Sequence, residues 1–172
     1  MGNATYWIEK LNLQAHPEGG FFAESYRADL TLSASSLPAS YGGARVASTA
    51  IYFLITEAAF SALHKVSSDE GWHYYTGNSP IYLTIISPEG ELTEVILGPD
   101  VEAGQQFQYV VPAEHWFAAE VKGSQDGAEG FALVGCTVAP GFDFDDFKLG
   151  KRADLIDSFP QHQQLIERLT RS

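Results

Sequence analysis

The sequence predicts an all-β fold, a sandwich or barrel of short strands, with a short helix before it and one or two helices after it. β-Branched and aromatic residues gather in about eight short runs between residues 45 and 140. Glycine, proline, asparagine and aspartate separate these runs, as turns require. The chain shows no alternation of strands with helices and no repeat of solenoid length, which excludes parallel α/β folds and solenoids.

Two elements of different character precede the barrel strands. Residues 4–13 have the spacing of an irregular amphipathic helix, which the turn-forming residues 16–20 end. Residues 21–27 alternate as a strand does, and residues 31–43, rich in Ser, Ala and Gly, form a flexible excursion. The strands that follow are expected at residues 46–56, 60–66, 71–76, 81–87, 92–97, 107–111, 115–121 and 131–138.

The C-terminal tail differs from the barrel region. Residues 151–158 and 161–171 carry apolar side chains at helical spacing, and Pro160 fits the first turn of the second helix. We expect these helices to pack on the outside of the barrel. Residues 1–172 then form a single domain, with its barrel core at about residues 45–140 and its helical tail at about residues 151–171.

Composition and charge narrow the range of partners. The chain has 22 acidic and 10 basic side chains, a net charge of -12, so its surface repels nucleic acid and anionic membranes. No signal-peptide pattern and no apolar run of about 18 residues is present. The single cysteine, Cys136, excludes an internal disulfide and a Cys-rich zinc site. These observations favour a cytoplasmic protein whose partner is a small molecule.

Residues 63–77 have the outline of an incomplete metal-binding motif. A metal-holding barrel would carry His-x-His-x3-Glu-x6-Gly here; His64, Glu70 and Gly77 fit this spacing, whereas Val66 takes the place of the second histidine. Strand alternation predicts that Phe60, Ala62 and Val66 share the interior face with His64. Trp72 and Tyr74 are expected on the face of Glu70, and His73 and Tyr75 on the other. The His64–Glu70 pair could be a ligand pair, a proton relay or a hydrogen-bonded structural pair.

The segment 111–117 makes a resemblance to cupins definite. The second cupin motif is roughly Pro-x-Gly-x-x-His, but here Glu114 replaces the glycine and Phe117 takes the histidine position. Only His64 and Glu70 then remain of the four usual ligands, too few for a tight divalent site, so no metal and no other cofactor is expected. His115 shares the face of Phe117 and is the one side chain that could substitute.

Longer blocks resemble one cupin branch, the DUF985 family or cupin superfamily 5. Residues 16–27, 48–54, 68–77 and 135–144 are similar to its signature blocks, and the likeness extends from about residue 5 to about residue 170. The resemblance implies a double-stranded β-helix, the cupin jelly roll, usually paired as a homodimer around a central pocket. It carries no assigned reaction. The family's likeness to metal-free dTDP-sugar 3,5-epimerases is at the level of the fold.

Charged residues outside the barrel motifs have two interpretations. Glu18, Glu24 and Arg27 could belong to an N-terminal strand that covers the barrel mouth and lends charged groups to a ligand, or to a turn and an edge strand with a surface ion pair. Asp143, Asp145 and Asp146 are expected to form a solvated acidic edge. The phenylalanines among them, Phe142, Phe144 and Phe147, predict an apolar face that docks on the barrel or on a partner.

Three functions are compatible with this sequence. The first is binding of a small molecule, such as a sugar nucleotide or a nucleobase-like compound, in an aromatic-lined barrel pocket. The second is a metal-independent isomerase or epimerase of a carbohydrate derivative, with His64 as base and Glu70 orienting it. The third is a structural dimer with a vestigial pocket. The candidate catalytic residues are His64 and Glu70, and the candidate ligand-binding residues are Glu24, Arg27, Tyr52, Trp72, Tyr74, His115 and Phe117.

Overall fold

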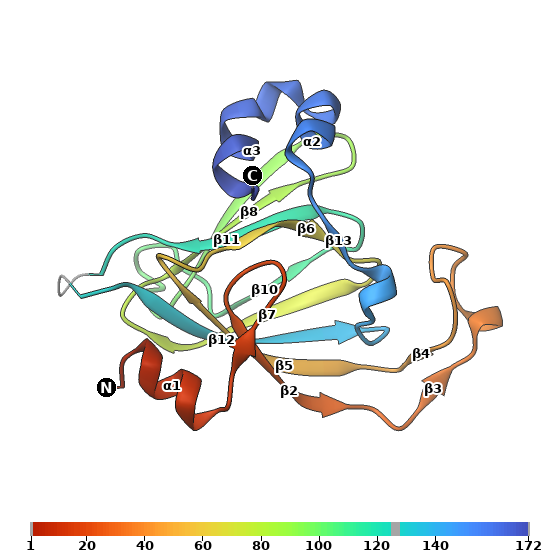
Figure 1. Cartoon of the computed structure of the whole chain (residues 1–172), viewed down its shortest axis with the longest axis horizontal. Coiled ribbons are helices and arrows are strands. Elements are labelled where there is room, and N and C mark those ends of the chain that lie inside the picture. The colour runs from red at the N-terminus through yellow and green to blue at the C-terminus, as the bar shows by residue number, and fades with distance from the viewer. Residues whose placement is uncertain (1, 125–127, 172) are drawn as a thin grey trace.

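Two antiparallel β-sheets packed face to face make up most of the molecule, as the computed structural model shows for residues 2–124 and 128–171 (Figure 1). The six-stranded sheet has the order β1 (Gln14–Ala15), β2 (Phe21–Arg27), β5 (Thr49–Thr56), β12 (Phe131–Ala139), β7 (Asp69–Gly77), β10 (Gln108–Val111). The five-stranded sheet has the order β13 (Lys148–Leu149), β6 (Ser61–Lys65), β11 (Trp116–Val121), β8 (Ile81–Ile86), β9 (Leu92–Leu97). The predicted all-β fold is confirmed.

Short elements complete the chain. The helices are α1 (Ala4–Lys10), α2 (Arg152–Ser158) and α3 (Gln163–Leu169), with 3-10 turns at Ala34–Ser36, Phe144–Asp146 and Pro160–His162. Strands β3 (Thr31–Leu32) and β4 (Arg45–Val46) pair with each other and carry an arm that extends away from the barrel in Figure 1. Asn3 begins α1, because its side-chain oxygen accepts a hydrogen bond from the Tyr6 N–H at 2.9 Å.

The main core lies between the two sheets. Every second side chain of each strand points into this space, so apolar residues of both sheets meet there. Fully buried examples are Phe53, Trp72 and Phe117. Trp72 lies edge to face with both phenylalanines, with ring centroids 5.6 Å and 6.2 Å away.

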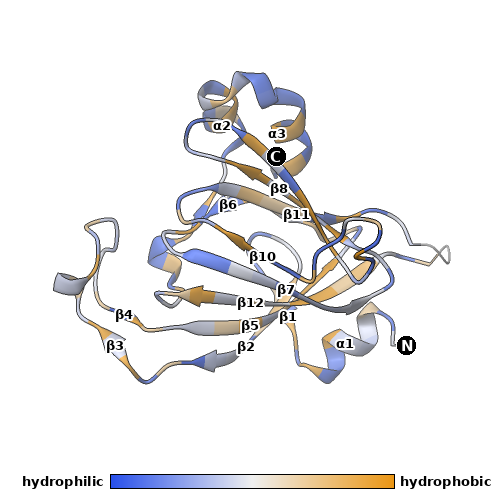
Figure 2. Cartoon of the chain, turned by 180° about the vertical axis from the view of Figure 1, so that it is seen from behind, coloured by the Kyte–Doolittle hydropathy of each residue, from blue (hydrophilic) through white to orange (hydrophobic). Residues whose placement is uncertain are grey.

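The terminal helices cover part of the outer face of each sheet. Leu13 and the partly buried side chains of α1 pack against the outer face of the six-stranded sheet. Leu155, Ile166 and Leu169 of α2 and α3 pack on the five-stranded sheet, as predicted. Hydrophobic residues concentrate in strands such as β8 and β12, whereas α2 and α3 turn hydrophilic residues outward (Figure 2). No helix in the described part of the chain is long and apolar enough to cross a membrane.

The prediction that Phe60 and Ala62 share the interior face of the barrel with His64 is wrong. The pairing of β6 with β11 joins His64 to Phe117 and Ser61 to Ala119, so three steps along β6 correspond to two along β11. This bulge brings Ser61, in place of Ala62, to the face that carries His64. Phe60 consequently packs with the C-terminal helices outside the barrel, and not in its interior. Val66 faces the interior as predicted.

Candidate functional site

A cavity of about 200 Å³ lies between the two sheets. The face of β2, β5 and β12 that points inward supplies one wall, and His64 comes from β6 in the opposite sheet. Titratable side chains make up half of the lining, and most of the other side chains are aromatic or aliphatic. The lining residues are His16, Glu18, Phe22, Glu24, Arg27, Thr49, Ile51, Phe53, His64, Val66, Glu70, Cys136, Val138, Phe142, Asp143 and Phe144.

Glu18 and His64 form a buried pair in this cavity. The carboxyl Oε2 of Glu18 lies 3.2 Å from Nε2 of His64, and Oε1 accepts a hydrogen bond from the Ser61 hydroxyl at 2.8 Å. The side chains of Glu18 and His64 are only 8% and 2% exposed. Sequence reasoning paired His64 with Glu70, but the structure gives His64 a different carboxyl partner.

The turn before β2 positions Glu18. Gly19 and Gly20 have φ of 110° and 72°, a region that residues with a Cβ rarely adopt. A Cβ on Gly19 would come within 2.0 Å of the carbonyl oxygen of Phe60, so the turn lies directly against the chain that leads into β6. The Ala62 N–H also donates to the Glu18 carbonyl at 2.9 Å. These contacts hold the Glu18 side chain in front of Ser61 and His64.

Hydrogen bonding defines the protonation of the Glu18–His64 pair. Nδ1 of His64 lies 2.8 Å from the Ala62 carbonyl, an acceptor only, so Nδ1 carries a hydrogen. Burial lowers the pKa of His64 to about 3, so Nε2 carries none at neutral pH. Burial, with Glu70 nearby, raises the pKa of Glu18 well above its usual range. We therefore infer that the neutral Glu18 carboxyl donates to Nε2 of His64.

His16 lies on the other side of Glu18. Its Nδ1 accepts a hydrogen bond from the Glu18 backbone N–H at 3.3 Å and lies 3.4 Å from Oε2. Its ring contacts Phe22 edge to face, with centroids 4.6 Å apart, and stacks near Phe144 at 6.0 Å. Burial lowers the pKa of His16 to about 4, so this imidazole is neutral at physiological pH.

Glu70 lines the cavity from β7 in the sheet that faces His64. It is 7% exposed, and burial raises its pKa to about 7, although the neighbouring Cys136 and Trp72 side chains oppose this shift. No Lys, Arg or His side chain forms an ion pair with Glu70 among residues 2–124 and 128–171. Burial without a cationic partner therefore lets this carboxyl keep its proton to a higher pH than an exposed glutamate does.

Glu24 and Arg27 lie at the more exposed end of the cavity. Arg27 donates from Nε and Nη2 to both carboxylate oxygens of Glu24, at distances from 2.6 to 3.2 Å. Residues three apart on a regular strand face opposite sides, but β2 shifts register between Glu24 and Tyr26, and this bulge brings both to the cavity face. Their side chains are 42% and 45% exposed. The hydrogen bonds from Arg27 to Glu24 raise the pKa of Arg27, and the nearby carboxylate of Asp143 raises it by a smaller amount.

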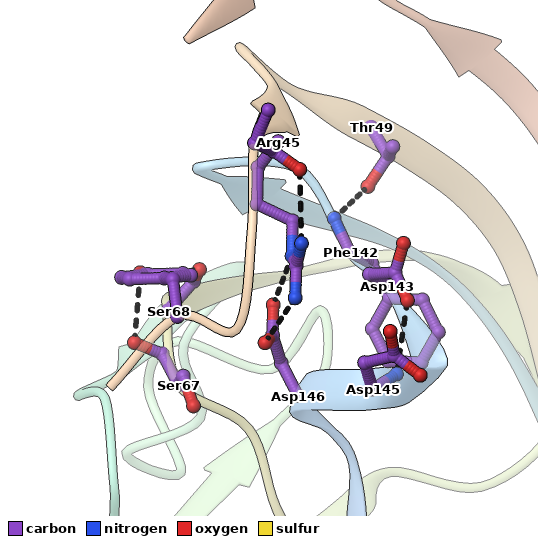
Figure 3. Close-up of polar contacts among 10 residues, drawn as sticks. Arg45, Thr49, Ser67, Ser68, Phe142, Asp143, Asp145 and Asp146 are labelled. Carbon is purple, nitrogen blue, oxygen red and sulfur yellow. Dashed lines mark hydrogen bonds and ion pairs between the residues drawn. The ribbon is translucent and has the colours of Figure 1, made fainter. Parts of the chain in front are cut away.

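The segment after β12 contributes another part of the cavity lining, and Figure 3 shows the polar contacts that hold it. Phe142 and Phe144 line it, and the Phe142 N–H donates to the Thr49 hydroxyl at 2.9 Å. Arg45 holds this segment through two hydrogen bonds of 2.7 Å to Asp146, in an ion pair whose side chains are both 6% exposed. The predicted docking on the barrel is confirmed for Phe142 and Phe147, which pack against the main core, whereas Phe144 is 53% exposed. The prediction of a solvated acidic edge is wrong for Asp146.

The other predicted ligand-binding residues lie away from the cavity lining. Trp72 and Phe117 are buried in the core behind it, and the Tyr74 hydroxyl donates to the Ser79 carbonyl at 3.3 Å. Tyr52 points to the outer face, where its ring lies 6.2 Å from that of Tyr75. His115 lies in the loop before β11, with Nδ1 3.0 Å from the Ala113 carbonyl. His16 and Asp143 line the cavity without having been singled out from the sequence as ligand-binding residues.

The donor set does not fit a cupin metal. Within residues 2–124 and 128–171, no three His, Cys, Asp or Glu side chains are grouped as metal ligands would be. Val66 and Phe117 occupy the positions of two cupin histidines, and the Phe117 ring lies 4.1 Å from that of His64. A fully buried phenyl ring offers no lone pair at this position, so Phe117 cannot ligate a metal.

Two facing antiparallel sheets around a partly enclosed cavity define the jelly roll of the cupin class. The model of one family, the Cupin superfamily (DUF985), matches residues 5–150, and the chain belongs to this family. The chain is also 29% identical over 154 residues to "Uncharacterized protein YML079W" of Saccharomyces cerevisiae, a match that covers 86% of this chain and 75% of the yeast protein.

Solved structures agree with this assignment. A hypothetical protein from Leishmania major has a TM-score of 0.89 and 34% identity, with 99% of this chain and 100% of that one covered. Protein SO0799 of Shewanella oneidensis has a TM-score of 0.86 and 37% identity, with 99% of both chains covered. Oxalate decarboxylase of Bacillus subtilis shares only the fold, with a TM-score of 0.51, 14% identity and coverage of 90% of this chain and 36% of the enzyme.

Proposed function

We propose that this cupin binds a small molecule of about one ring in the cavity beside Glu18, His64 and Glu70. The observation that carries the proposal is that buried titratable side chains line a cavity between the sheets. Buried polar groups normally complete their hydrogen bonds within the fold. Groups of this kind that converge on a cavity with apolar walls are typical of a ligand site.

The volume of the cavity limits the size of the ligand. A cavity of about 150 Å³ holds a benzene ring, and the present cavity measures about 200 Å³. It has room for a sugar ring or a nucleobase with one or two substituents. Of a sugar nucleotide, only one ring would fit inside, and the remainder would extend past Glu24 and Arg27.

The polarity of the walls fixes how such a ring would be oriented. Phe22, Phe53 and Phe142 offer apolar contact for its faces. Glu18 and Glu70 offer carboxyl groups to polar substituents at its edge. Ligand sites commonly combine apolar walls with a few polar groups that set orientation.

A pair of tryptophan substitutions on β5 tests the proposal. Ile51 lines the cavity, so Ile51→Trp would fill it without removing any charged group. Tyr52 follows it on the same strand and points outward, so Tyr52→Trp is the matched control. A panel of sugars, nucleobases and amines would be titrated into each protein by calorimetry. Mass spectrometry would identify any compound retained through native purification.

We expect a ring-sized compound to bind the parent protein and the Tyr52→Trp variant alike, and to bind Ile51→Trp at least tenfold more weakly. Thermal unfolding of each variant checks that it is folded. Equal affinity in a folded Ile51→Trp variant would place the binding elsewhere and overturn the proposal. Failure of every compound to bind the parent would count against it as well.

A second candidate function is metal-independent isomerisation or epimerisation of a carbohydrate derivative. The hydrogen-bonded Glu18–His64 pair is the observation that favours it, because such a pair can deliver and accept a proton at a bound substrate. Glu18 would donate and Nε2 of His64 would accept, while the Ala62 carbonyl holds Nδ1–H in place. Glu70 would provide a second acid or base on the opposite wall.

Solvent-isotope exchange tests this second function. Incubation of candidate keto-sugars in deuterium oxide would show deuterium at the carbon next to the carbonyl if a proton is removed there. His64→Asn should abolish exchange and should still bind the substrate. Exchange that persists in His64→Asn would contradict the role of His64 as the base. Absence of exchange in a parent protein that binds the compound would leave binding as the sole function.

A further inference from the structure

We infer that the ligand is a small organic cation, a ring that carries a protonated amine or amidine, held between the Glu70 carboxylate and the phenylalanines of the cavity. This inference rests on the proposed function and specifies its ligand class. It differs from the sugar nucleotide considered from the sequence, which is an anion.

The balance of charged groups around the cavity is the first support. Four carboxyl side chains line it, those of Glu18, Glu24, Glu70 and Asp143, against one cationic side chain, Arg27. Glu18 is neutral in its pair with His64, so the negative charge comes from the other three. Arg27 already donates to both oxygens of Glu24 and therefore has limited capacity for an anionic ligand. The imidazoles of His16 and His64 add no positive charge near neutral pH, because burial lowers the pKa of both. An anion would meet carboxyls here, whereas a cation would be attracted.

Glu70 is the second support. Glu70 is 7% exposed and lines the cavity, and no cationic side chain within residues 2–124 and 128–171 pairs with it. The titratable groups around it are Glu18 and His64 across the cavity and the Cys136 thiol on β12, none of which supplies positive charge near neutral pH. A buried carboxylate without a cation is unfavourable, and a bound ammonium or amidinium group would supply the missing charge.

The aromatic walls are the third support. Phe22, Phe53, Phe142 and Phe144 line the same cavity as Glu70. The negative face of an aromatic ring attracts a cation within about 6 Å, and cages of such rings are a common means of binding organic ammonium groups. A carboxylate beside aromatic rings is therefore suited to a cationic ring compound. The net charge of -12 also favours the approach of cations.

Three probes of one size and different charge test the inference: benzylamine, benzyl alcohol and benzoate. Each is a benzene ring with one small substituent and fits the cavity volume. Their affinities would be measured at pH 8 by ligand-detected NMR and calorimetry. We expect benzylamine, which is protonated at this pH, to bind at least tenfold more tightly than the other two.

Two substitutions test whether Glu70 causes the preference for benzylamine. Glu70→Gln keeps the size of the side chain and removes its charge, and should reduce the preference for benzylamine at least tenfold. Glu94 is an exposed residue of β9, so Glu94→Gln removes the same charge from the surface and should leave the preference for benzylamine unchanged.

The pH dependence of binding gives a further test of Glu70. The affinity of the parent for benzylamine should rise about tenfold from pH 6 to pH 8, because Glu70, with its pKa of about 7, loses its proton in this range.

The outcomes separate this inference from the proposed function. Preferential binding of benzyl alcohol or benzoate in the parent, with loss of binding in Ile51→Trp, would confirm a ligand cavity and overturn the cationic ligand. A preference for benzylamine that survives in a folded Glu70→Gln variant would overturn the role of Glu70. If none of the three probes binds, the result would count against the proposed function of the cavity as a ligand site.

Discussion

Glu18 connects the turn before β2 to the interior of the five-stranded sheet. Its carboxyl contacts Ser61 and His64, and its backbone contacts His16 and Ala62. A carboxyl at this depth is stable when it is neutral and each of its oxygens has a partner. The hydrogen bonds of His64 fix which partner donates, so the chemistry of the pair can be tested by changing a single atom.

Substitutions of Glu18 distinguish a neutral pair from an ionic one. Glu18→Gln retains a carbonyl oxygen for Ser61 and an N–H for Nε2 of His64, so we expect its free energy of unfolding to stay within about 1 kcal/mol of the parent. Glu18→Ala leaves both partners unpaired in a buried site and should cost about 2–4 kcal/mol. Urea denaturation at pH 7 measures both. Similar large losses in the two variants would indicate an ion pair.

The stability of the protein should report the raised pKa of Glu70. In the folded state this group holds its proton up to about pH 7, whereas its ordinary pKa is 4.5. Its stabilising contribution is therefore complete below pH 4.5 and is lost as the pH rises towards 7.

Glu70→Gln should remove the loss of stability that deprotonation of Glu70 causes. The free energy of unfolding of the variant, relative to the parent, should increase between pH 5 and pH 7 by on the order of 1 kcal/mol per pH unit and then level off. Glu94→Gln should show no comparable trend. A difference between Glu70→Gln and the parent that stays constant with pH would show that Glu70 titrates normally.

Strand alternation predicts one half of the candidate site and misses the other. It places His64 and Glu70 on facing interior surfaces, as the structure does, and places His73 and Tyr75 outside. It fails for Tyr52, because both faces of β5 are apolar and the pattern does not tell which face is inside. The contact of Glu18 with His64 joins residues far apart in the sequence, and only the paired glycines after Glu18 indicated a close approach of the backbone.

At the scale of whole strands, the sequence predicts where the strands lie but not where β-bulges shift their register. The expected strands and helices occur near their predicted positions, because the strand segments are rich in β-branched and aromatic residues and the tail has helical spacing. The register shifts in β2 and β6, which bring Glu24, Arg27 and Ser61 to the cavity face, have no such signal. A bulge depends on pairing with a neighbouring strand, and the site is built where alternation breaks down.

The turn of residues 16–20 should be essential to the geometry of the site. Gly19→Ala would place a Cβ about 2.0 Å from the Phe60 carbonyl at a φ of 110°, so the turn would have to move away from β6. We expect a loss of about 2 kcal/mol or more in unfolding free energy and at least tenfold weaker ligand binding.

Gly42→Ala is the control for this prediction. Gly42 lies in the arm between β3 and β4, and a Cβ there has no atom within 4 Å. Its substitution should leave both stability and binding close to those of the parent. Unchanged binding in Gly19→Ala would mean that the turn does not position Glu18 for the ligand.

At the scale of the whole molecule, we expect a homodimer. The outer face of the six-stranded sheet bears Tyr26, Tyr75 and Val110, which are 56%, 54% and 55% exposed, and Tyr52 at 36%. Exposed aromatic residues gathered on one sheet face are typical of an interface between subunits. Light scattering after size exclusion should give about twice the 18.8 kDa mass of one chain.

A charge placed on this face tests the mode of pairing. Tyr75→Glu should shift the protein towards the monomer, because it would bury a carboxylate between the subunits. Leu92→Glu, on β9 in the other sheet, should leave the mass unchanged. A monomeric parent protein, or a dimer insensitive to Tyr75→Glu, would contradict this assignment of the interface.

The side-chain nitrogens of the five histidines provide the most direct test of the ligand cavity. The tightest-binding ring compound of the charge series would be titrated into protein labelled with nitrogen-15. His16 and His64 line the cavity, whereas His73, His115 and His162 do not. We predict saturable shifts of the imidazole signals of His16 and His64, with the other three unchanged. Shifts confined to those three, or no saturable change at His64, would contradict binding between the sheets.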